Sequence, residues 1–153
     1  MSDKKKVMMK KCHECGARAV RPLAKPGRMT KYRAMEMEIP ATLEIPTCAE
    51  CGVEWFDGPT DSALDAALDE IYQGRLKETL KADLEKIFGQ GISQARVERA
   101  LGVSEGYISK LKREERNPGS ELVVAVRLLA ADPEKMVPRA TDVFANHKKR
   151  RHA

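Results

Sequence analysis

Two CxxCG motifs are the feature that most constrains how this 153-residue chain can fold. The motifs contribute the chain's four cysteines, Cys12, Cys15, Cys48 and Cys51. Four thiolates from two such turns can converge tetrahedrally on one Zn²⁺ ion, as they do in structural zinc sites. Gly16 and Gly52 follow the two pairs, and a glycine there lets the backbone turn sharply past the sulfur atoms. We therefore expect one structural Zn²⁺ per chain, held by these four cysteines.

Other uses of the cysteines fit the sequence less well. A thioredoxin-like redox site needs one CxxC in a βαβ setting, and no such setting is visible. The N-terminus has no apolar segment typical of a secretory signal, so we expect a cytoplasmic protein with reduced thiols. His13 lies inside the first motif, but the cysteine set is complete without it. Four cysteines also leave no open position for water, which argues against a catalytic zinc.

An enzyme is not expected for further reasons. The sequence shows no His/Glu ligand set, no nucleophile motif and no glycine-rich phosphate loop. It also has no apolar run long enough to span a membrane.

The segment between the two motifs alternates apolar and acidic residues, which predicts short strands at 35–39 and 43–45 with one buried face. Pro40 and Pro46 favour edge positions in such strands. We therefore predict a zinc ribbon at 11–58, preceded by a basic N-terminal extension at 1–10. A ribbon of this size buries little apolar surface, so metal binding should supply much of its folding free energy.

Charge is segregated along the chain although the net charge is only +5. Residues 1–33 carry a net charge of +9, residues 34–85 carry −10, and residues 86–153 carry +6. The basic C-terminal part suits an anionic partner such as nucleic acid. The acidic middle suits a basic protein, although a solvated surface would show the same charges.

Helices are predicted after the ribbon. Apolar residues at helical spacing predict an acidic connecting helix at 59–75, which Ser62 and Asp65 would start as a capping box. A second helix follows over 76–88, or the two form one helix weakened at Gly74.

A helix-turn-helix is predicted next, within a helical domain at 76–132. Ser93 starts a helix that Gly102 ends in a left-handed conformation, and Ser104 starts the next helix, which reaches about Arg113. Another apolar helix covers 122–131. Residues 133–153 are predicted as a basic tail, disordered over 147–152, in which 139–146 could form one short helix.

This stretch resembles the Cro/CI (xenobiotic response element) helix-turn-helix family, on the residues Ser93-Gln94, Ala100 to Ser104, Ile108-Ser109 and Asn117-Pro118. The resemblance implies that the helix starting at Ser104 enters the major groove of DNA. Base-edge contacts are then expected from the start of that helix, and phosphate contacts from basic residues around it. The expected DNA-contacting residues are Gln94, Arg96, Ser104, Glu105, Gly106, Tyr107, Ser109, Lys110, Lys112, Arg113 and Arg116.

The two motifs together resemble the MqsA-type antitoxins, whose N-terminal part is a YgiT-type zinc finger. The segment 45–57, which contains the second CxxCG, is particularly similar. The resemblance implies a ribbon that binds a small basic toxin, and a C-terminal half that dimerises and represses its own operon. It places Gly106 and Lys110 where that family uses Asn and Arg for DNA contact, so a different operator preference is expected.

The sequence thus predicts an α+β protein: a small zinc ribbon with short antiparallel strands, followed by an all-α helix-turn-helix bundle. The predicted function is a dimeric, sequence-specific repressor, either an antitoxin or a free-standing bacterial or phage regulator. A zinc-ribbon adaptor that binds proteins but not DNA remains the alternative.

Overall fold

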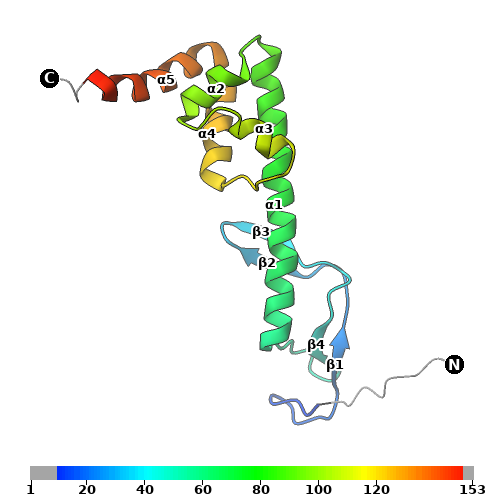
Figure 1. Cartoon of the computed structure of the whole chain (residues 1–153). Coiled ribbons are helices and arrows are strands. Elements are labelled where there is room, and N and C mark those ends of the chain that lie inside the picture. The colour runs from blue at the N-terminus through cyan, green and yellow to red at the C-terminus, as the bar shows by residue number, and fades with distance from the viewer. Residues whose placement is uncertain (1–9, 150–153) are drawn as a thin grey trace. The chain divides into compact units, whose positions relative to one another are not determined.

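The computed structural model describes residues 10–149 and divides into two compact units, 1–71 and 72–153 (Figure 1). The order is four strands followed by five helices. The strands are β1 (Val20–Leu23), β2 (Met29–Tyr32), β3 (Met35–Glu38) and β4 (Ile45–Cys48). The helices are α1 (Gly58–Gly89), α2 (Gln94–Leu101), α3 (Tyr107–Lys112), α4 (Ser120–Ala131) and α5 (Pro133–Lys149). Within 10–149, no helix is long and apolar enough to cross a membrane.

The first unit contains two antiparallel two-stranded sheets, one of β1 with β4 and one of β2 with β3. In the β1–β4 sheet, Val20 lies opposite Cys48, so strand pairing brings the second cysteine motif beside the chain that follows the first. The alternation at 35–39 correctly predicted β3, and Met37 is fully buried. The sequence analysis did not predict β1 and β2, because two of the four side chains in each strand are exposed and apolar alternation is weak. The predicted α+β class is confirmed.

Helix α1 is continuous from Gly58 to Gly89, so Gly74 lies inside one helix. Its start differs from the predicted capping box. The Asp57 carboxylate accepts hydrogen bonds from the Thr60 hydroxyl (2.6 Å) and the Thr60 backbone N–H (3.0 Å), whereas Ser62 lies within the helix and donates to the Gly58 carbonyl. The two bonds from Thr60 lower the pKa of Asp57, because both favour the ionised carboxylate. The structure thus moves the helix start about one turn towards the N-terminus.

The second unit has one apolar core, to which the C-terminal part of α1 and all four later helices contribute. Ser93 is the N-cap residue of α2 and Gly102 ends it with φ 68°, as predicted. The next helix differs from prediction, since α3 begins at Tyr107 rather than at Ser104. Gly106 precedes it with φ 79°, a left-handed conformation that other residues adopt only at a cost. The glycine therefore shortens α3 at its N-terminus.

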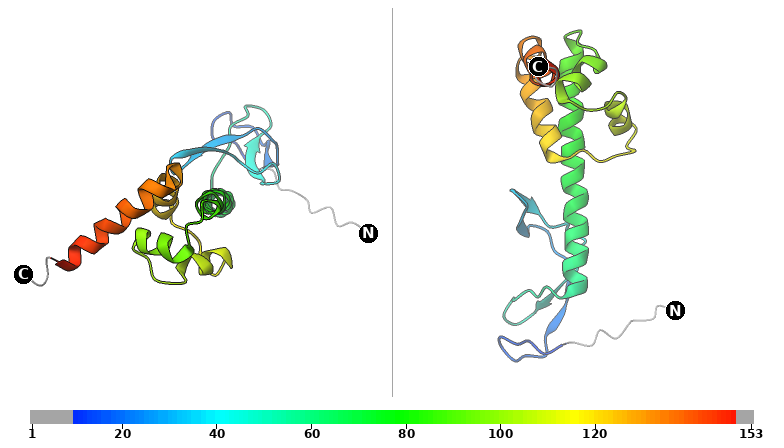
Figure 2. Two further views of the ribbon diagram at one scale, coloured as in Figure 1. Left: turned by 90° about the horizontal axis from the view of Figure 1, so that it is seen from above. Right: turned by 60° about the vertical axis from the view of Figure 1, so that its left-hand side comes forward.

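Helix α5 occupies most of the region predicted as a tail. It begins at Pro133, a residue well suited to a first helical turn, and continues to Lys149 despite Pro138. Pro133 and Val137 are buried, and α5 lies against α2 and α4. This burial explains why the region is helical. The possible helix at 139–146 is present as part of α5, and the prediction of a tail is wrong for the rest of 133–149. The last part of α5 extends away from the other helices of the unit (Figure 2). The extension 1–9 and residues 150–153 lie outside the described residues.

Two glycine-to-alanine substitutions should change stability in opposite directions. Gly102→Ala places a side chain at φ 68°, where an added Cβ would lie 2.5 Å from Cζ of Phe144. We expect the free energy of unfolding to fall by at least about 1–2 kcal/mol, the cost of left-handed backbone. Gly74→Ala is the control: it lies inside α1 with nothing within 4 Å, and should raise the free energy of unfolding by about 0.5–1 kcal/mol. Urea denaturation followed by circular dichroism measures both, and a neutral Gly102→Ala would contradict the prediction.

Candidate metal centre and nucleic-acid interface

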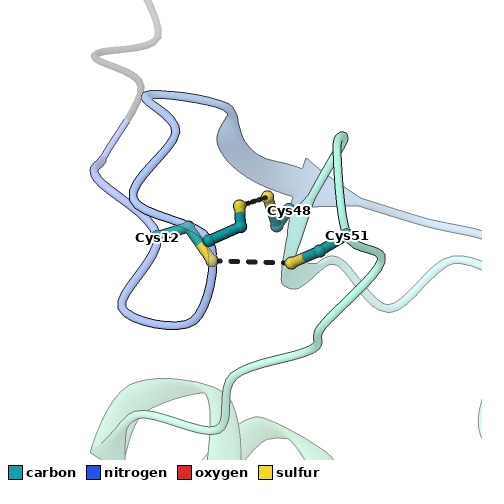
Figure 3. Close-up of side chains that lie close together, drawn as sticks. Cys12, Cys48 and Cys51 are labelled. Atoms are coloured by element: carbon teal, nitrogen blue, oxygen red, sulfur yellow. Dashed lines mark hydrogen bonds between the residues drawn. The ribbon is translucent and has the colours of Figure 1, made fainter.

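The four cysteine sulfur atoms lie together in the geometry of a tetrahedral metal site. The Sγ atoms of Cys12 and Cys51 are 3.6 Å apart, as are those of Cys15 and Cys48 (Figure 3). All four Sγ atoms lie within 4.8 Å of one another. Zinc–sulfur bonds of about 2.3 Å place the sulfurs of a tetrahedral site about 3.8 Å apart. The cluster can therefore hold a Zn²⁺ ion.

Both cysteine motifs fold into the same backbone turn. The Gly16 N–H donates to the Cys12 carbonyl at 3.0 Å, and the Gly52 N–H donates to the Cys48 carbonyl at 2.9 Å. Both glycines have positive φ, 76° and 74°. The turn that each CxxCG motif predicts is thus formed, with the glycine in the conformation it favours. Cys12 and Cys48 are buried with Val20 in a small apolar cluster.

The ionisation of the thiols favours a cation in this position. The backbone N–H of Cys51 is the main group that lowers the pKa of the Cys48 thiol, to about 7, because it stabilises the thiolate. The N–H of Val53 acts on Cys51 in the same way, but burial and the neighbouring sulfurs outweigh it and raise the pKa of Cys51 to about 12. Neighbouring thiolates repel one another, and a divalent cation bound between them relieves this repulsion. Metal binding should therefore release protons and weaken as the pH falls.

His13 lies apart from the sulfur cluster, as expected. Its ring packs against Trp55, with 5.1 Å between the ring centroids and an interplanar angle of 31°. The metal-ligand group of the described residues contains the four cysteines alone.

The predicted DNA-contacting residues fall into a central group and a peripheral one. In the central group, Gln94 at the start of α2 donates from Nε2 to the Ser109 hydroxyl of α3 at 2.8 Å. The Arg116 guanidinium lies over the Tyr107 ring, 6.0 Å from its centroid. Lys110 is exposed one residue beyond Ser109. The helix-turn-helix thus brings together side chains from both of its helices and from the loop after α3.

The peripheral residues have other neighbours. Lys112 lies over the Phe88 ring of α1, 4.4 Å from its centroid, and Arg113 pairs with Glu115 at 2.9 Å. Arg96 lines a small hollow with residues of α5, so the structure does not bring it together with the α3 side chains. Ser104 and Glu105 are exposed in the turn before α3 rather than on the helix.

The sequence analysis missed Glu98, a buried acidic residue of α2. Its carboxylate accepts hydrogen bonds from the backbone N–H groups of Gly106 (3.1 Å) and Ile108 (2.9 Å) and from Nε2 of Gln94 (3.0 Å). It therefore joins α2 to the first turn of α3. The one signal in the sequence is its position four residues after Gln94, which places the two side chains on one helix face.

Comparison with known proteins supports the assignment of a helix-turn-helix in the second unit. Residues 84–126 match the family described as Helix-turn-helix, and this range contains α2 and α3 and ends within α4. A search of curated proteins finds no match. The family match supports a DNA-binding transcription regulator, and the sulfur cluster supports a metal site in the other unit.

Metal binding can be tested with a matched pair of variants. Cys48→Ser removes a ligand, so we expect it to lose the one equivalent of zinc that the parent binds. His13→Ala should retain that zinc. Chelation should unfold the ribbon but leave the helical unit folded, because the helical core contains no cysteine. Metal analysis and NMR measure these outcomes. Zinc retained in Cys48→Ser, or ribbon signals unchanged after chelation, would count against a structural Cys₄ site.

Proposed function

We propose that the protein is a sequence-specific transcriptional repressor that binds its own promoter, with a zinc ribbon that binds a protein partner. The observation that carries the DNA-binding part is the helix-turn-helix match over 84–126, which coincides with a folded α2–α3 pair bearing exposed basic residues. In this proposal the ribbon spans 11–58 and holds one structural Zn²⁺. The helical unit provides the DNA-binding surface.

Helix α3 is the proposed recognition helix. In helix-turn-helix proteins its N-terminal part contacts base edges, and neighbouring basic residues contact phosphates. Lys110 is exposed there and can donate to guanine O6 or N7. Arg113 and Arg116 are also exposed and are suited to phosphate contacts. Gly106 offers no side chain and has a left-handed backbone, so the contact with a base edge at this place is expected from its neighbour Tyr107.

A homodimer is proposed because two recognition helices must meet successive major grooves, about 34 Å apart. Helix α4 offers a surface for this contact. Val124 and Leu128 are four residues apart on one face and are 59% and 58% exposed, high values for large apolar side chains. A second copy of the chain would remove this face from water.

A basic protein is the proposed partner of the ribbon unit. Asp61, Asp65 and Glu70 are exposed on the N-terminal part of α1, within the acidic middle of the sequence. These carboxylates would repel DNA and attract a basic surface. Together with the Cys₄ site, they support the resemblance to antitoxins whose ribbon binds a small basic toxin.

The proposal differs from two alternatives in what it predicts. A free-standing regulator would bind the promoter but capture no toxin. An adaptor would capture a basic protein and shift no DNA. The helix-turn-helix match favours DNA binding over the adaptor.

DNA binding is tested by fluorescence anisotropy at about 0.15 M salt, near physiological ionic strength. The zinc-loaded protein should prefer its own upstream DNA to a scrambled duplex by about 10³-fold or more. Lys110→Ala should lose about tenfold or more in affinity for the upstream DNA, whereas Arg116→Ala should weaken both duplexes similarly. Lys31→Ala, an exposed lysine of β2, is the control. Equal affinity of the parent for both duplexes would contradict sequence-specific repression.

The dimer surface is tested with Leu128→Asp. The side chain is exposed, so the monomer should keep its fold within about 0.5 kcal/mol. A buried carboxylate at the contact should shift sedimentation towards the monomer and weaken promoter binding. Lys135→Asp, an exposed site on α5, is the control and should remain dimeric. If the Leu128→Asp protein sediments as a dimer, the dimer contact lies elsewhere.

A further inference from the structure

The buried carboxylate of Glu98 determines which hydrogen-bonding groups α2 can offer to a ligand. Glu98 is 3% exposed, and an ionised carboxylate only accepts hydrogen bonds. Its Oε2 accepts from the Gly106 N–H, and its Oε1 accepts from the Ile108 N–H and from Nε2 of Gln94. Three N–H donors thus satisfy this charge inside the unit, as a buried carboxylate requires.

This arrangement fixes the orientation of the Gln94 side-chain amide. Its nitrogen must face Glu98, because the amide oxygen would meet a carboxylate that has no hydrogen to donate. The same nitrogen lies 2.8 Å from the Ser109 hydroxyl oxygen and 3.0 Å from Glu98 Oε1. An amide nitrogen has two hydrogens, so these two bonds use both of them.

The Gln94 amide oxygen is the one hydrogen-bonding group of this side chain that remains available to a ligand. Within residues 10–149 it has no hydrogen-bond partner, and the side chain is only partly buried. A free glutamine side chain offers both an acceptor and a donor, which is how it forms a bidentate pair with adenine N6 and N7. Gln94 offers an acceptor alone.

We propose that Glu98 makes Gln94 a hydrogen-bond acceptor towards DNA, so that the base it contacts must present an amino group in the major groove. Adenine N6 and cytosine N4 carry such a group, whereas guanine and thymine offer only acceptors there. Glu98 is thus a positioning residue that acts through Gln94. The inference rests on the proposed DNA-binding function.

The experiment selects binding sites from randomised duplexes with the zinc-loaded full-length protein. The position at which Gln94→Ala loses base preference is the one that Gln94 contacts. There the parent should prefer adenine or cytosine over guanine and thymine by about fivefold, consistent with a single hydrogen bond. In Glu98→Ala the acceptor is gone, so one hydrogen of the Gln94 amide nitrogen is released and can be offered to a base. The preference against guanine should then fall to within about twofold, with the preference at the Lys110 position unchanged.

Ser109→Ala provides a second, milder variant in case Glu98→Ala fails to fold, which circular dichroism would reveal. Removal of the hydroxyl frees one Gln94 hydrogen, so the amide can complete the bidentate pair with adenine. The preference for adenine over cytosine at the same position should then increase.

Several outcomes would overturn the inference. They are a parent preference for guanine or thymine at the Gln94 position, no position altered by Gln94→Ala, or folded Glu98→Ala and Ser109→Ala proteins whose base preferences match the parent. A uniform loss of affinity in Glu98→Ala, with preferences intact, would assign Glu98 a structural role alone. If the parent selects no sequence at all, the proposed DNA-binding function fails as well, and this result is distinct from the others.

Discussion

Convergence of four sulfur atoms is the constraint on which the first unit depends. The apolar cluster at the cysteine site contains only Cys12, Val20 and Cys48 as buried members, and the two sheets have two short strands each. Met37, Ile39, Ile45 and Leu68 are also buried in this unit, but a core of this size is small against the conformational entropy of a chain of this length. The ends of the ribbon are held together because Cys12 meets Cys51 and Cys15 meets Cys48 across more than thirty residues. A metal ion bound there would link ribbon folding to metal supply and to pH.

The second unit is held together differently. Its core is a single apolar cluster formed by α1, α2, α3, α4 and α5, and this cluster contains no cysteine. Within this apolar unit, Glu98 is a polar exception placed at the junction of the two helix-turn-helix elements. Removing one partner of such a buried network costs more than a surface hydrogen bond, because the remaining charge would lack partners. The junction between α2 and α3 is therefore fixed by hydrogen bonds as well as by packing.

The different chemistry of the two units is consistent with separate roles. The helical unit carries exposed basic residues on and after α3, whereas the start of α1 carries exposed carboxylates. A surface that attracts phosphate and one that repels it suit different partners. Under the proposed function, this separation would let one short chain bind promoter DNA and also present a surface to a basic protein.

The sequence by itself determined the features that depend on local chemistry. Cysteine spacing predicted the sulfur cluster, apolar alternation predicted β3, and Gly102 predicted the end of α2, because each depends on a few neighbouring residues. Tertiary structure decided the rest. Burial of Val137 made a helix of the predicted tail, and the left-handed Gly106 moved the start of α3. The role of Glu98 was also beyond sequence reasoning, since its partners Gly106 and Ile108 come within hydrogen-bonding distance only when α2 and α3 pack together.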